Sequence, residues 1–329
     1  MASPHPSLRE LLLARVRLRW PILLAAATLL AMFFVPTGGS EGGRIVAVSR
    51  DFMHFPLFAI LAAILLNFWP RHHTAVAKAG VVAGAAVVLA LLIEVIQPLA
   101  GRSAAWLDVA LGTAGSFAVA AVYLGLRSAS GRAKRWLCAT AGLLFLASCA
   151  PLAIVAVDRI FALRQFPLID SFERPAEVSR WIAEGCRLSQ TPDHATHGRY
   201  ALKLEVTGDG GAYPGAYLAD GVLDWRGYNR LSLDVFYEGD AARVLWIRMD
   251  DRPFPTYAER VQVPVDLQPG ANQISIDLEA FARTPGGRPL DLSRVQTLWL
   301  FLDHPRPGEV LYLDHFRAWG RAPRNPVSG

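Results

Sequence analysis

Six polar residues interrupt the hydrophobic first half of the sequence, and their spacing could support binding chemistry. They are Asp51, His54, Glu94, Gln97, Arg102 and Asp108. Residues three or four apart share a helix face, so Asp51 is expected beside His54, and Glu94 beside Gln97. An ionisable side chain within a membrane is costly unless it is paired or faces water. Two interpretations stay open: an outward-facing pocket for a polar headgroup or envelope precursor, or an internal ion-pair network that fixes helix register.

Catalysis by these six residues is disfavoured. A histidine beside carboxylates could act as a general base. However, no nucleophile and no metal-ligand spacing accompany His54. We therefore predict no catalytic residue and no cofactor for this half. An enzyme or transporter of lipid-linked envelope precursors stays an alternative function.

The second half carries aromatic, acidic and basic side chains of the kinds that bind sugars. Aromatic rings stack on the C–H faces of sugars, and nearby polar groups bind the hydroxyls. The predicted carbohydrate-binding residues are Tyr213, Trp225, Tyr228, Arg248, Asp250, Asp251, Tyr257, Asp303 and His304. The loop 251–257 is the expected contact surface. The competing interpretation is that Trp225, Trp246 and Trp299 fill a core.

Two further carboxylates could hold a structural calcium ion. Glu173 and Asp314 fall in the first and last predicted strands of the second half, which we expect to be neighbours. Together with backbone carbonyls they could supply oxygen ligands for Ca²⁺. The alternative is a pair of hydrogen-bonded carboxylates.

The elements that must position the first six residues are long hydrophobic helices. Five apolar runs are long enough to cross about 30 Å of hydrocarbon. They are residues 20–35, 52–69, 76–97, 104–126 and 136–157. Helices are expected because each backbone amide must find its partner within the segment in a membrane.

The charge distribution predicts the orientation of these helices. Residues 1–164 hold 15 of the 33 basic residues and 6 of the 28 acidic residues, so the first half carries +9 and the remainder −4. The basic residues lie at the ends of apolar runs and do not line one face, which argues against nucleic acid as a partner. The positive-inside rule places the N-terminus in the cytoplasm and residues after about 159 outside the inner membrane.

Part of the hydrophobic half resembles a known family. Asp51 with His54, Glu94 with Gln97, Arg102, and Asp108 followed by Gly115 are similar in order and spacing to motifs of the VanZ-like membrane proteins. The resemblance covers roughly residues 44–126. That family usually has Asn where this chain has Gly112. An activity that needs the Asn carboxamide is therefore not expected from the resemblance. Gly112 and Gly115 are spaced for close helix packing.

The second half predicts an antiparallel β-sandwich of the jelly-roll type. Short alternating runs replace the long apolar ones, and turn residues separate them. The predicted strands are residues 168–172, 200–206, 216–219, 230–237, 244–249, 260–265, 273–278, 297–302 and 310–319. Many short strands without intervening helices indicate a sandwich.

This half resembles the galactose-binding-like jelly rolls, which include many carbohydrate-binding modules. The resemblance is carried by four segments: 170–173, 197–204, 224–234 and 311–314. It covers nearly all of residues 166–320 and implies glycan binding. Because such folds carry unrelated functions, it does not identify a ligand.

These observations predict three parts of the chain: a transmembrane helical domain at 1–164, an exported jelly roll at 165–321 and a disordered tail at 322–329. The expected protein is a multi-pass envelope protein, anchored among membrane lipids, whose sandwich binds a glycan or glycolipid. A structural anchor that binds another envelope protein is the remaining alternative. An exposed aromatic sheet would favour sugar, and an apolar patch without polar groups would favour protein.

Overall fold

The computed structural model describes residues 43–68, 73–100, 105–208, 211–218, 224–252 and 255–320. Its contacts divide these residues into two compact units. The helical unit comprises the described residues from Val48 to Leu152. The sandwich unit comprises Gly43–Ala47 and the described residues from Ala153 onward. The domain bounds predicted from the sequence stay a prediction.

Long helices form the first half of the chain, as predicted. They are α2 (Gly43–Phe52), α3 (His54–Phe68), α4 (Ala75–Ile96), the short 3₁₀ helix η1 (Gln97–Ala100), α5 (Trp106–Arg127) and α6 (Gly131–Gln165). Four stretches among them are long and apolar enough to cross a membrane. The first predicted segment, residues 20–35, lies outside the described residues. The last helix is longer at both ends than the predicted run 136–157, and it continues through Pro151.

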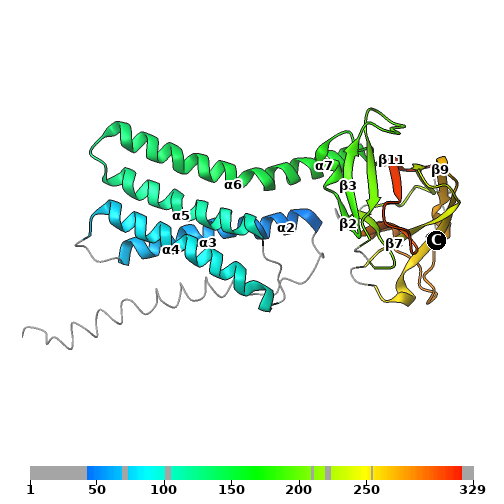
Figure 1. Cartoon of the computed structure of the whole chain (residues 1–329), viewed down its shortest axis with the longest axis horizontal. Coiled ribbons are helices and arrows are strands. Elements are labelled where there is room, and N and C mark those ends of the chain that lie inside the picture. The colour runs from blue at the N-terminus through cyan, green and yellow to red at the C-terminus, as the bar shows by residue number, and fades with distance from the viewer. Residues whose placement is uncertain are drawn as a thin grey trace, which may run out of the picture. The chain divides into compact units, whose positions relative to one another are not determined.

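Helices α3, α4 and α5 pack side by side in the helical unit (Figure 1). The approach of α3 to α5 depends on two glycines, as the sequence indicated. A Cβ atom at Gly115 would lie 2.1 Å from the carbonyl oxygen of Phe55, and one at Gly112 would lie 2.8 Å from the ring of Phe58. Ser116 donates a hydrogen bond of 3.3 Å to the carbonyl of Phe58. These contacts bring the first two turns of α3 against the second and third turns of α5.

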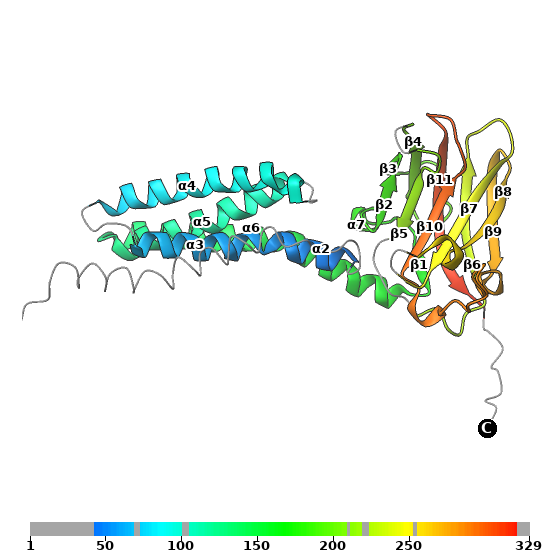
Figure 2. The same cartoon turned by 90° about the horizontal axis from the view of Figure 1, so that it is seen from below.

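Two antiparallel sheets form the sandwich unit, which confirms the predicted fold class (Figure 2). The six-stranded sheet has the order β3 (Cys186–Thr191), β4 (Ala201–Val206), β11 (Val310–Trp319), β6 (Arg230–Tyr237), β9 (Gly270–Asp277), and β1 (Leu168–Asp170) also pairs with β11. The five-stranded sheet has the order β2 (Trp181–Glu184), β5 (Gly215–Leu218), β10 (Thr297–Leu302), β7 (Arg243–Asp250), β8 (Val261–Leu267). Short helices α7 (Pro175–Val178), η2 (Tyr257–Glu259), η3 (Leu278–Phe281) and η4 (Leu292–Arg294) lie in the connections.

The core of the sandwich lies between the two sheets. Alternate residues of β6, from Leu231 to Tyr237, are buried, and their neighbours are half-buried. The same alternation in the facing sheet places Leu245 and Ile247 of β7 in the core. Strands β2 and β3 were not predicted, because their residues are mostly polar or exposed. Both are edge strands, and each buries only one side chain, so neither shows a clear apolar alternation.

Candidate functional site

An aromatic surface covers the outer face of the five-stranded sheet. Successive side chains of a strand point to opposite faces, so the residues between the core leucines of β10 and β7 point outward. We name this surface the aromatic face. Its residues are Tyr213, Tyr217, Trp246, Trp299 and Phe301.

The strand register places these rings in contact. Trp299 of β10 pairs with Tyr217 of β5, and their ring centroids are 5.6 Å apart. Phe301 lies 5.7 Å from Trp299 and 6.4 Å from Trp246, and the rings of Trp246 and Phe301 are nearly parallel. Gly215 faces Phe301 across the strand pair, and a Cβ there would lie 2.7 Å from the Phe301 Cβ. The glycine therefore makes room for the ring at the centre of the face.

Most of these rings are accessible to a ligand. Tyr213 is 53% exposed, and Tyr217, Trp246 and Trp299 are half-buried. Only Phe301 is buried, beneath its neighbours. Aromatic groups of this size normally lie in a core, so their exposure on one sheet face is a feature that calls for a ligand or a partner.

Charged groups adjoin the aromatic face. Arg248 bonds to Asp250 through two nitrogens, at 3.0 and 2.7 Å, and its guanidinium carbon lies 5.1 Å from the Trp299 ring centroid. Burial raises the pKa of Asp250 above its ordinary value, although the bond from Arg248 opposes this shift. Burial, followed by the charge of Glu184, raises the pKa of Tyr217. The Tyr217 hydroxyl therefore stays protonated at neutral pH and can donate a hydrogen bond.

A second polar pair lies at the rim of the aromatic face. His304 Nδ1 lies 2.5 Å from a carboxylate oxygen of Asp303, and both side chains are exposed. The His304 ring contacts the edge of Tyr213, with centroids 5.7 Å apart. The structure thus brings together five residues predicted from the sequence: Tyr213, Arg248, Asp250, Asp303 and His304.

The other predicted carbohydrate-binding residues are not all on a free surface. Trp225 is fully buried and, with Tyr228, packs against Phe166, so the competing core interpretation holds for Trp225. Asp251 is buried and bonds to Arg288 at 2.5 and 2.7 Å, which stabilises the loop that follows β7. Tyr257 is exposed at the start of η2. The core interpretation is wrong for Trp246 and Trp299, which are half-buried and alternate with the core residues of β7 and β10. The residues predicted from the sequence also did not include Tyr217 and Phe301.

Glu173 and Asp314 brace a loop with hydrogen bonds, and we name this pair the loop brace. Asp314 accepts hydrogen bonds from the backbone N–H groups of Thr196 and His197, at 2.7 and 2.8 Å. Glu173 accepts two from Arg199 and Tyr200, at 2.8 and 3.0 Å. Each carboxylate thus accepts hydrogen bonds from backbone N–H groups. This is the arrangement expected from the sequence as the alternative to a calcium site.

A buried charge network in the sandwich unit was not predicted. Arg180 bonds to Asp158 of α6 at 2.6 and 2.8 Å and to Asp170 at 3.3 Å. Asp158 also accepts from Arg44, and Trp181 donates to Asp170 at 2.8 Å. Burial raises the pKa of Asp170 well above its ordinary value, although Arg180 opposes the shift. Burial opposes the charge on Arg180, yet the bonds to Asp158 and Asp170 raise its pKa.

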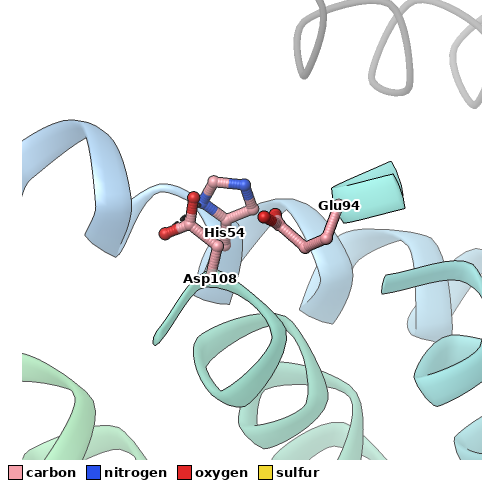
Figure 3. Close-up of side chains that lie close together, drawn as sticks. All are labelled: His54, Glu94 and Asp108. Carbon is pink, nitrogen blue, oxygen red and sulfur yellow. Dashed lines mark ion pairs between the residues drawn. The ribbon is translucent and has the colours of Figure 1, made fainter. Parts of the chain in front are cut away.

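The polar residues of the helical unit also converge in part. His54, Glu94 and Asp108 lie together, each on a different helix (Figure 3). His54 Nδ1 lies 3.5 Å from an oxygen of Asp108 and 3.0 Å from the carbonyl oxygen of Asp51. The predicted neighbour Gln97 is buried, whereas the Asp51 side chain is half-buried. Arg102 lies outside the described residues.

Comparisons with known proteins give structural likenesses only. No family model matches the chain, and no curated protein matches it. A family 11 carbohydrate-binding module from Clostridium thermocellum is 18% identical, with a TM-score of 0.36, over 47% of this chain and 95% of that one. An exo-β-agarase is 16% identical, with a TM-score of 0.39, over 47% of this chain and 25% of that one. The chain thus spans about a quarter of the agarase. The similar structures include carbohydrate-binding modules, whereas the VanZ-like resemblance has no matching family model and stays a prediction.

Proposed function

We propose that this chain is a membrane-anchored envelope protein whose β-sandwich binds a glycan on the aromatic face. The observation that carries the proposal is the row of contacting rings from Tyr217 through Trp299 and Phe301 to Trp246. A row of rings on a sheet offers a stacking surface to the apolar faces of successive sugar units.

The charged residues beside these rings favour a sugar over a protein as the ligand. Sugars present hydroxyl groups at the edges of their apolar faces, and these need hydrogen-bond partners. Arg248 and Asp250 lie on the same outer face as Trp299, and Asp303 with His304 lies at the Tyr213 rim. The core of a protein-binding patch is generally depleted of charged residues.

Glycan binding by the full-length chain tests this proposal. The detergent-purified protein is applied to an array of bacterial and plant glycans, and the Kd of each positive glycan is then measured by calorimetry. Trp299→Ala is expected to weaken binding by about 2 kcal/mol, or roughly thirtyfold, as for a central aromatic contact. Trp319→Ala is the matched control, because Trp319 lies on β11 of the other sheet and is also accessible.

Two results would overturn the glycan proposal. One is the absence of selective binding by a folded protein to any glycan on the array. The other is an equal loss of binding in Trp299→Ala and Trp319→Ala, which would place the ligand elsewhere. A protein captured on the aromatic face in the first case would favour the structural-anchor alternative.

We further propose that the sandwich lies outside the inner membrane. The basic residues at the ends of the apolar runs support this orientation by the positive-inside rule. Alkaline phosphatase fused after residue 320 is expected to be active in cells, because that enzyme needs an exported environment. A fusion after residue 129, in the predicted cytoplasmic connection, should be inactive. The opposite pattern would refute the orientation.

A further inference from the structure

Three potential metal ligands converge in the helical unit from three helices. His54 begins α3, Glu94 lies in the last turn of α4, and Asp108 lies in the first turn of α5. One ligand atom of each residue lies within 4.8 Å of the other two. Figure 3 shows the imidazole between the two carboxylates. The three side chains are 4%, 7% and 3% exposed.

The donor types suit a divalent transition metal. An imidazole nitrogen and two carboxylates provide nitrogen and oxygen ligands, as Zn²⁺, Mn²⁺ and Fe²⁺ prefer in protein sites. With a neutral imidazole, Glu94 and Asp108 supply two negative charges, which balance a divalent ion.

Neighbouring groups hold the ligands in place. Nδ1 of His54 lies 3.0 Å from the carbonyl oxygen of Asp51. The same nitrogen lies 3.5 Å from an oxygen of Asp108, so contacts to two residues fix the orientation of the ring. Glu94 accepts a hydrogen bond of 2.7 Å from the Ala105 N–H, and the Gln97 amide nitrogen, when turned toward Glu94, lies 3.0 Å from its other oxygen. Such second contacts are typical of metal ligands.

We propose that His54, Glu94 and Asp108 bind one divalent transition-metal ion in the helical unit. The site is independent of the glycan proposal, since its residues lie in the other unit. The competing arrangement is a metal-free one in which a protonated His54 pairs with the carboxylates.

Zinc binding by the full-length chain tests the metal site. The detergent-purified protein is stripped with a chelator, equilibrated with a buffered series of free Zn²⁺ concentrations, and its metal content is measured by mass spectrometry. We expect one zinc ion per chain. Glu94→Gln and Asp108→Asn should weaken binding at least tenfold, because each removes one charged ligand and keeps the side-chain volume.

The control variant is His304→Gln, because His304 forms an exposed His–Asp pair that could bind zinc non-specifically. It should retain the zinc content of the wild type. A milder variant, Gln97→Ala, keeps all three ligands and should weaken zinc binding by about 10- to 100-fold through loss of the contact to Glu94. Gln97→Ala therefore still tests the site if Glu94→Gln or Asp108→Asn fails to fold.

Cobalt provides a second readout. Co²⁺ bound by one imidazole and two carboxylates should give visible absorption bands that His54→Gln abolishes while the helical circular dichroism stays unchanged. The proposal is overturned if the folded wild type binds no stoichiometric Zn²⁺, or if zinc content is the same in Glu94→Gln, Asp108→Asn and the wild type.

Discussion

Replacing Arg180 with Met should destabilise the sandwich unit strongly. The Arg180 side chain is 1% exposed, and it makes two bonds to Asp158, one to Asp170 and one to the carbonyl of Ile169. Arg180→Met keeps a long side chain in the same space but leaves two buried carboxylates without their central cation. Breaking a buried pair in this way costs about 3–5 kcal/mol in the free energy of unfolding.

The cost is expected to come mainly from Asp158. Burial already raises the pKa of Asp170, so that carboxyl can take up a proton when Arg180 is removed. Asp158 keeps Arg44 as a partner, which limits the loss. Replacing both residues, as Arg180→Met with Asp158→Leu, should recover only part of the lost stability. It removes the buried Asp158 carboxylate that lacks Arg180, but it also takes away the carboxylate to which Arg44 bonds.

Urea unfolding of the full-length protein in detergent measures this effect. Trp181, which donates to Asp170, is one of the nine tryptophans whose fluorescence follows the unfolding. Arg226→Met is the matched control: Arg226 is 69% exposed in its pair with Asp224, and its loss should cost no more than about 1 kcal/mol. The reasoning would be refuted if Arg180→Met and Arg226→Met lowered the unfolding free energy equally.

Three further predictions concern other parts of the chain. Burial, followed by the charge of His197, lowers the pKa of His315 below 6.5. The neutral ring therefore contributes stability that is fully present above pH 6.5. This contribution is lost as the pH falls from 6.5 through the lowered pKa. His315→Asn suits the left-handed backbone there, and melting temperatures measured from about pH 7.5 to 5 should vary less with pH than in the wild type. Gly115→Ala should cost about 1–3 kcal/mol in detergent unfolding because of its close helix contact, whereas Gly142→Ala, which has open space, should cost nothing; equal effects would contradict the packing. Removing calcium with EGTA and adding it back should leave the melting temperature of the sandwich unchanged, because the loop brace already binds N–H donors. A melting temperature that depends on calcium would instead support a calcium site at Glu173 and Asp314.

The hydropathy of long segments and the alternation of apolar and polar residues predicted the fold class. Both patterns depend on which side chains face the core, the solvent or the lipid. The alternating β6 sequence, from Leu231 to Tyr237, needed only local information. The end of α6 was harder to predict. Asp158 ended the apolar run, but the helix continues to Gln165, and the charge of Asp158 is compensated by Arg180, which is 22 residues away.

The site was predicted in part, for reasons visible in three tryptophans. Trp299 stands between Leu298 and Leu300, and Trp246 between Leu245 and Ile247, so the immediate neighbours of each ring do not mark the outward side of the strand. In β7 the alternation of Trp246 with Arg248 and Asp250 does mark it. Trp225 lies beside polar residues and yet is buried. The pairing of β10 with its neighbours places Trp299, and the packing of Phe166 against Trp225 buries that ring.

The metal ligands illustrate a different limit. Metal sites are recognised in a sequence by short, regular ligand spacings. His54, Glu94 and Asp108 each come from a separate helix, so the spacing between them reflects helix lengths and connections and forms no motif. The packing of α3 against α5 at Gly115 brings two of them together.

The outer strands of the five-stranded sheet restrict how another chain could attach to it. Strand β8 carries Pro264, which has no backbone N–H, and the exposed Asp266, while β2 is only four residues long. Short strands, prolines and charges at an edge oppose the addition of a foreign strand by backbone hydrogen bonding. Neither margin of this sheet is suited to extending it into a larger assembly. Crowded copies of the protein should therefore not pair through the edges of this sheet, while its ring-bearing surface stays accessible.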